Sequence, residues 1–142
     1  MYGIKNKIAL AGITSLALAS LVVAASSADP QTTLYIHGFG AQVEPKQVVV
    51  SPGSACTPAA DHLNSWRRWG AARTSSRGRL YFSRGHPDCA SATHRTGGKV
   101  VLSHARDCPS GVHYLRVRFV FSNHHSRDRI IDVKCDGYLT PS

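Results

Sequence analysis

The chain has 142 residues, of which 42% are hydrophobic and 18% are charged, and its formal net charge at pH 7 is +9. This length fits one domain with an adequate hydrophobic core. Only the N-terminal segment is apolar enough to enter a bilayer, which excludes a protein that spans a membrane several times.

The N-terminal segment has the pattern of a secretory signal peptide. Lys5 and Lys7 precede an apolar run over residues 8–25, and the small residues Ser26, Ser27 and Ala28 follow it. A basic start, a short apolar centre and a small-residue cleavage site are typical of export signals. We therefore predict cleavage after Ala28 and a single mature domain over residues 29–142, either secreted or associated with the cell wall. An uncleaved membrane anchor is the alternative.

The predicted mature chain is strongly cationic. Without Lys5 and Lys7, 15 of the 17 Lys and Arg remain against 8 Asp and Glu. Such an excess favours encounter with polyanions such as nucleic acid, cell-wall polymers or acidic lipid headgroups. It could equally reflect a genome that favours arginine codons, together with the net charge that solubility requires.

Two short strands are expected before residue 52. The first covers residues 33–37 and ends at the peptide IHGFG, residues 36–40. That peptide resembles the oxyanion loop of α/β-hydrolases, but no GxSxG motif accompanies it, so a glycine turn that ends a strand is favoured. The second strand covers residues 47–51 between Pro45 and Pro52.

A helix is expected over residues 57–73. Thr57 can cap it, Pro58 suits its first turn, and an apolar stripe recurs at helical spacing. Trp69 lies at the margin of that stripe, with His62 and Arg73 on its side. These three residues form a candidate platform for a ring or an anion; the alternative is that Trp69 caps the core.

Polar and strand-like segments alternate after the expected helix. Residues 74–78 read as a polar breaker, residues 79–83 as a strand, residues 84–98 as a loop and residues 99–105 as another strand. The peptide DCPSG, residues 107–111, then turns the chain into the clearest element of the sequence.

That element is a β-hairpin over residues 112–135. Leu115, Val117 and Phe119 alternate with polar residues, which is the period-two pattern of a half-buried strand. The opposite face carries Tyr114, Arg116 and Arg118, an aromatic ring with arginines such as single-stranded nucleic acid binds. An ordinary solvated sheet face is the alternative, because Asp132 on the partner strand can pair with either arginine.

The mature part contains four cysteines, which predict two disulfides in an exported protein. The pairing cannot be derived from the sequence; we favour Cys56 with Cys89 and Cys108 with Cys135, since each pair then closes one supersecondary unit. The eight histidines and four cysteines show no spacing typical of zinc ligands, so no metal and no cofactor are predicted.

Five or six strands with close turn signals predict a mainly β domain, an antiparallel β-sandwich-like fold with one short helix. The alternative is an α+β domain, with a single sheet and the 57–73 helix packed across it.

The expected function is that of a secreted, monomeric cationic binding module for an unidentified protein or polyanion, without membrane contact after cleavage. A small hydrolase of an anionic polymer, similar to a ribonuclease, is the first alternative, but no spacing couples the histidines into an acid–base pair. In general outline the chain also resembles small exported bacterial protease inhibitors, which implies the loops 83–89 and 107–111 as the presenting segments. A structural protein of the cell wall is a further alternative. Because no catalytic pair is evident, the sequence favours a binding protein over an enzyme, without deciding between them.

Overall fold

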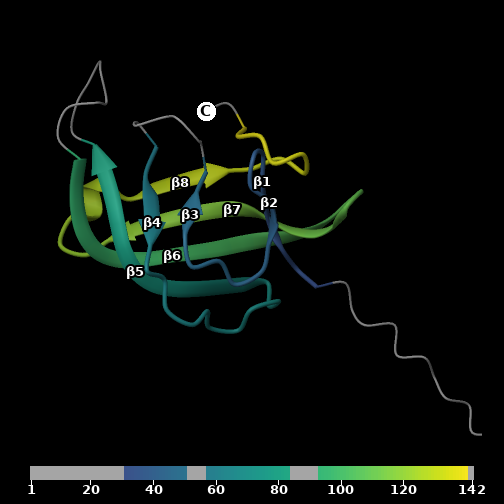
Figure 1. Ribbon diagram of the computed structural model, residues 1–142, viewed down its shortest axis with the longest axis horizontal. Coiled ribbons are helices and arrows are strands. Elements are labelled where there is room, and N and C mark those ends of the chain that lie inside the picture. The colour runs from purple at the N-terminus through teal and green to yellow at the C-terminus, as the bar shows by residue number, and fades with distance from the viewer. Residues whose placement is uncertain (1–30, 51–56, 84–92, 141–142) are drawn as a thin grey trace, which may run out of the picture.

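The computed structural model describes residues 31–50, 57–83 and 93–140, and in these ranges the protein is mainly β (Figure 1). Its elements in chain order are β1 (Leu34–Ile36), β2 (Gly40–Gln42), β3 (Val48–Val49), β4 (Ala59–Asp61), β5 (Arg73–Ser83), β6 (Thr93–Cys108), β7 (Gly111–Phe121), the 3-10 turn η1 (His125–Arg127) and β8 (Arg129–Asp132). The predicted mainly β class is confirmed.

The strands form two antiparallel sheets. One has six strands in the order β3-β4-β5-β6-β7-β8, so that each strand pairs with its neighbours in sequence, and the other is the hairpin β1-β2. The large sheet curls, and β3 and β4 cross in front of the long β6 and β7 in Figure 1. Thr33, just before β1, bridges to His113 at the start of β7 and attaches the small sheet to the large one.

The curled sheet encloses one hydrophobic core. Alternate residues of the three long strands face it, and β1, β3 and β4 cover it from the other side. The fully buried aliphatic and phenylalanine side chains are Leu34, Ile36, Val48, Leu80, Val100, Leu102, Val117, Phe119 and Phe121.

The helix predicted over residues 57–73 is wrong. Ala59–Asp61 is instead strand β4, paired with residues 79–81 of β5, and Arg68 to Gly70 form a turn. His62 and Arg68 adopt positive φ angles of 49° and 58°, which end any helical path. The long-range ladder outweighs the local helical pattern. Without this helix, the α+β alternative does not apply.

The polar breaker predicted at residues 74–78 is also wrong, because this segment is the first half of β5. Thr74 and Ser76 point inward and are each 2% exposed. Their hydroxyl groups donate to the carbonyl groups of Arg67 at 2.7 Å and Asn64 at 2.8 Å. Buried hydroxyl groups are tolerated when they have such partners, so this polar run can sit inside a sheet.

The glycines read as turn signals near residue 97 lie inside β6, so the predicted loop 84–98 is wrong over residues 93–98 and falls outside the described residues before that. Gly98 pairs with Gly78 across the strands. A Cβ on Gly78 would lie 2.7 Å from the Asp61 carbonyl oxygen. These glycines therefore allow a close approach of backbones rather than a turn.

The predicted hairpin is confirmed, with β7 and β8 paired from Arg116–Asp132 to Phe119–Arg129. The outward position predicted for Tyr114 is wrong, because its side chain is fully buried. His104, in the facing strand, has a φ of 57°. Leu102 lies on the core face before it and Ala105 packs against the core after it, so the alternation changes phase there and Tyr114, paired with Ala105, turns inward.

Cys108 and Cys135 form a disulfide, as favoured from the sequence. Cys56 and Cys89 lie outside the described residues, as do the predicted signal peptide at residues 1–28 and residues 84–89 of the loop proposed as an inhibitor segment. In the described ranges the chain forms no helix with the length and hydropathy that a bilayer crossing requires.

The IHGFG peptide forms the turn of the β1-β2 hairpin, in keeping with the glycine turn predicted for it. Gly38 and Gly40 have φ angles of 89° and 74°, which favour glycine. The N–H groups of His37 and Phe39 donate to the carbonyl groups of Gly137 and Ile36. These two donors are already bonded within the fold.

Candidate anion-binding face

The outer face of the large sheet carries a row of cations. Successive side chains of a strand point to opposite faces. Leu80 and Phe82 of β5 face the core, so the odd-numbered residues of β5 face solvent. Cross-strand register then continues this row over the neighbouring strands. The cationic side chains on this face are Arg73, Arg77, Arg79, Arg95, Lys99, Arg116 and Arg118.

Arg77 and Lys99 stand directly opposite each other, on β5 and β6. Within the described part of the chain, neither side chain forms an ion pair with a carboxylate. Cross-strand partners have Cβ atoms about 5 Å apart, so this is a pair of like charges in direct contact range.

A hollow of about 340 Å³ lies beside this pair. The segment that contains Asn64 and Arg67 forms one side, because the Asn64 and Arg67 N–H groups donate to the carbonyls of Arg77 and Ser75, both at 2.8 Å. The lining residues are Asn64, Ser65, Arg67, Ser75, Ser76, Arg77 and Lys99. The hollow thus offers three cations and the hydroxyl groups of Ser65 and Ser75, and no carboxylate lines it.

A second hollow, of about 170 Å³, shares Arg77 and Lys99 with the first and adds Gly98, Val120, Ser122 and His125. It also has no carboxylate in its lining. The Arg77–Lys99 pair therefore separates two adjoining hollows of one electrical sign. We call these two hollows together the cationic groove.

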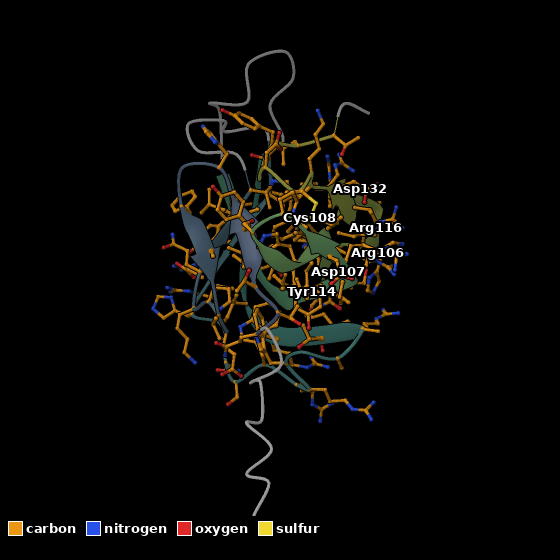
Figure 2. All side chains as sticks on the ribbon, turned by 90° about the vertical axis from the view of Figure 1, so that its right-hand side faces the viewer. Arg106, Asp107, Cys108, Tyr114, Arg116 and Asp132 are labelled. Atoms are coloured by element: carbon orange, nitrogen blue, oxygen red, sulfur yellow. A yellow bond between two sulfur atoms is a disulfide. The ribbon has the colours of Figure 1, made fainter. Side chains whose placement is uncertain are left out.

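Of the other cations of the face, Arg79, Arg116 and Arg118 each form an ion pair with a carboxylate, whereas Arg73 and Arg95 form none within the described residues. Arg116 holds Asp132 through two hydrogen bonds, Nε to Oδ1 at 2.6 Å and an Nη2 bond to Oδ2 at 3.0 Å, and Figure 2 shows the two side chains next to each other. Arg118 lies 3.8 Å from Asp128. Arg116 and Arg118, predicted as ligands, are thus engaged in the ordinary sheet pairing that was their alternative. Ligand binding by them stays a prediction.

A cluster around Asp61 closes one end of the face. Its carboxylate accepts hydrogen bonds from Arg79 Nε at 2.9 Å and from the Tyr81 hydroxyl at 2.9 Å, and it lies 3.0 Å from His62 Nδ1. Burial alone would raise the pKa of Asp61, but the hydrogen bonds from His62, Arg79 and Tyr81 outweigh it and lower the pKa to about 2. Asp61 is therefore a permanent anion near neutral pH, and it orients the exposed His62.

The platform predicted from helical spacing is not assembled. Trp69 packs edge-on against Trp66 and Tyr114, and its Nε1 donates to the Thr32 carbonyl at 3.0 Å. His62 belongs to the Asp61 cluster, while Arg73 begins β5 on the outer face. The core-capping alternative for Trp69 matches its packing, and of the three residues Arg73 is the one that joins the cationic row.

No lining residue of the groove was predicted as a site residue, including its three cations Arg67, Arg77 and Lys99. Arg67 and Arg77 fell within the misread helix and the misread breaker. The period-two order of Arg73, Ser75, Arg77, Arg79 and Tyr81 was the signal that could have placed Arg77 on a strand face.

Histidines do not form a metal centre in the described ranges, where no group of three or more His, Cys, Asp or Glu side chains could share an ion. Comparison of the chain with protein-family models, with characterised proteins and with solved structures finds no match.

Proposed function

We propose that the protein is an exported binding module for a polymer that carries phosphate or sulfate groups, and that the cationic groove is its binding site. The observation that carries this proposal is the sharing of Arg77 and Lys99 by two adjoining hollows without a carboxylate in either lining. Repeating anionic groups along a polymer could occupy both hollows at once. A single small anion would fill one.

The direct opposition of Arg77 and Lys99 supports a ligand of negative charge. Like charges at opposed positions of a sheet destabilise the fold by up to about 1 kcal/mol relative to a neutral pair. Elsewhere on the same face each arginine of β7 has a carboxylate partner. An anion bound between Arg77 and Lys99 would supply the missing counter-charge.

Export is supported by two features. Disulfides such as Cys108–Cys135 form and persist in oxidising compartments, and residues 1–28 have the pattern of a cleaved signal. N-terminal sequencing of the protein from the culture medium of its native host would test this part of the proposal, with Asp29 as the expected first residue. Retention of Met1 in a cell-bound protein would contradict it.

Binding is tested by fluorescence anisotropy with labelled single-stranded RNA, with polyphosphate and heparin as competitors. If Arg67, Arg77 and Lys99 neutralise about three phosphates, the logarithm of the binding constant should fall with the logarithm of salt concentration with a slope of about −2. The double variant Arg77→Ala/Lys99→Ala leaves one of the three contacts, so the slope should become shallower, at about −0.7. The competitors then distinguish phosphate from sulfate polymers.

The matched control is Lys46→Ala/Arg106→Ala, which removes one lysine and one arginine at exposed positions that line neither hollow of the groove. It lowers the net charge equally but should leave the slope nearly unchanged. Equal losses in both double variants would mean that overall charge, and not the groove, attracts the polymer. If RNA, polyphosphate and heparin all fail to bind the protein at low salt, the proposal is refuted.

Lys99→Glu separates function from stability. It places a carboxylate opposite Arg77, so we expect the free protein to gain up to about 1 kcal/mol in unfolding free energy while polymer binding is lost. A loss of unfolding free energy together with the loss of binding would show that Lys99 supports the fold.

A hydrolase of the same polymer is the second candidate, favoured by the Asp61 cluster on the same face. His62 has a side chain 69% exposed, oriented by Asp61 beside Arg79, so a base and a phosphate-binding cation adjoin. Cleavage of RNA that His62→Ala abolishes without weakening binding would establish it. If the RNA stays intact after prolonged incubation, the hydrolase is ruled out and the binding module is the remaining candidate.

A further inference from the structure

The tight turn between β6 and β7 presents a serine next to a buried histidine. Cys108 pairs with Gly111, so Pro109 and Ser110 form a two-residue connection. Ser110 is exposed, and its Oγ lies 2.7 Å from Nε2 of His113. A hydroxyl group within hydrogen-bond distance of an imidazole is the arrangement from which a serine nucleophile is activated.

His113 is held in a fixed orientation. Its ring is 2% exposed, Tyr35 stacks on it with ring centroids 5.5 Å apart, and its Nδ1 lies 2.7 Å from Oγ1 of Thr33. Burial lowers the pKa of His113, against an opposing effect of a hydrogen bond to the Val112 carbonyl. The imidazole is therefore neutral near pH 7 and able to accept a proton.

The surroundings of the ring favour one tautomer. Thr33 Oγ1 lies at hydrogen-bond distance from Nδ1 and can accept a hydrogen from it. A hydrogen on Nδ1 leaves the lone pair of Nε2 directed at the Ser110 hydroxyl, which can donate to it.

Ser110 also opens onto a hollow of about 470 Å³, within the size range of sites for small molecules. The turn that forms its far wall is fixed against β1, because a Cβ on Gly137 would lie 2.8 Å from the Tyr35 ring. The residues that line the hollow are Tyr35, Pro109, Ser110, Lys134, Cys135 and Asp136. The tyrosine ring, the proline and the Cys135 end of the disulfide give this hollow an apolar wall, and Lys134 and Asp136 add one charge of each sign.

We propose that Ser110 is a nucleophile, with His113 as its general base, that takes the acyl group of a small ester whose acid part is apolar or aromatic. Ser110 Oγ bonds to the ester carbonyl carbon while its proton passes to His113 Nε2. The bond from that carbon to the alcohol oxygen then breaks, and His113 returns the proton to the leaving oxygen. Water, deprotonated by His113, hydrolyses the acyl-serine, releases the carboxylic acid and restores Ser110.

This site is separate from the cationic groove. Lys99 and Cys108 belong to the same strand, β6, nine residues apart, which is a distance of about 30 Å at the rise of an extended chain. Failure of either proposal therefore leaves the other standing.

The test uses a fluorophosphonate probe and a p-nitrophenyl benzoate substrate on the whole protein. The probe phosphonylates an activated serine as fluoride leaves, and peptide mass spectrometry locates the adduct. We expect the adduct on Ser110, its loss in Ser110→Ala, and a rate at least about 100-fold lower in His113→Gln, the lower end of a general base's contribution. Ester hydrolysis should fall in parallel.

Ser126→Ala and His104→Asn are the matched controls, both at exposed positions that line neither the groove nor the Ser110 hollow, and they should react as the unaltered protein does. Because His113→Gln removes a buried ring, the unaltered protein in urea provides a second comparison, and labelling there should stop. Thr33→Val should slow labelling and Thr33→Ser should restore it, if Thr33 positions the ring. No adduct on Ser110 of the folded protein, or equal rates with and without His113, would overturn the proposal.

Discussion

Replacement of Tyr114 by phenylalanine tests whether this residue is an internal anchor. Its hydroxyl donates to the Ala71 carbonyl at 2.8 Å and accepts the Gly70 N–H at 3.0 Å. Each such hydrogen bond contributes about 1 kcal/mol net, and the Tyr114→Phe change leaves both backbone partners without it. We therefore expect a loss of about 2 kcal/mol in the free energy of unfolding.

Urea denaturation followed by tryptophan fluorescence measures this loss, since the Trp69 ring lies 5.4 Å from that of Tyr114. The transition midpoint should fall without a change in its slope, and the salt dependence of polymer binding should not change. Tyr35→Phe is the control, because the Tyr35 hydroxyl has no hydrogen bond within the described part of the chain. A loss below about 0.5 kcal/mol for Tyr114→Phe would refute the anchoring role.

Three further predictions concern stability. The double variant Cys108→Ser/Cys135→Ser should lose about 3.5 kcal/mol, the chain-entropy value for a sequence separation of 27, and an unchanged urea midpoint would contradict it. Gly98→Ala should cost about 2 kcal/mol or more because its Cβ would clash with the backbone of β7 and a core leucine, whereas Gly97→Ala has nothing within 4 Å and should change the midpoint little. The pKa of His113 is lowered on folding, so its unfolded form binds a proton first and stability should fall as pH drops below about 6.5; His113→Gln should remove that part of the pH dependence.

The hairpin of β7 and β8 could be predicted because its signal is local. The alternation of Val117, Phe119 and Phe121 with polar residues matches a half-buried strand, and no tertiary contact reverses it. The phase change at His104 could not be predicted, since a single residue with positive φ leaves no trace in the hydrophobic pattern. That one residue decides whether Tyr114 faces solvent or the core.

The expected helix failed for a related reason. Trp66 and Trp69 are three residues apart, which suits one face of a helix, but each indole N–H reaches a carbonyl far away in sequence, those of Pro45 and Thr32. A loop can present two rings to one core as well as a helix can. Pattern alone does not separate these cases, because the ladder between β4 and β5 that decides them is non-local.

The groove itself depended on knowledge of the sheet order. Arg77 and Lys99 are 22 positions apart in the sequence, and only the register of β5 with β6 places them opposite each other. The hydroxyl-lined wall likewise requires the pairing of Arg67 with Ser75. The sequence predicted a cationic surface, but not where its charge is left without a counter-ion.

The placement of carboxylates, more than the number of arginines, distinguishes the groove from a bias in composition. Such a bias sets how many arginines the chain has, but it does not keep carboxylates away from them. Asp61 lies on β4, while Asp128 and Asp132 lie at β8, so these acids neutralise the two flanks of the outer face. The three central strands contain Asp107 as their one carboxylate, and it stands at the far end of β6.

Charges that lie within about 10 Å of one another reinforce each other at moderate salt, so the positive potential should be highest at Arg77 and Lys99. Added salt should therefore weaken polymer binding at Arg77 and Lys99 at a lower concentration than it disrupts the ion pairs of Arg116 and Arg118.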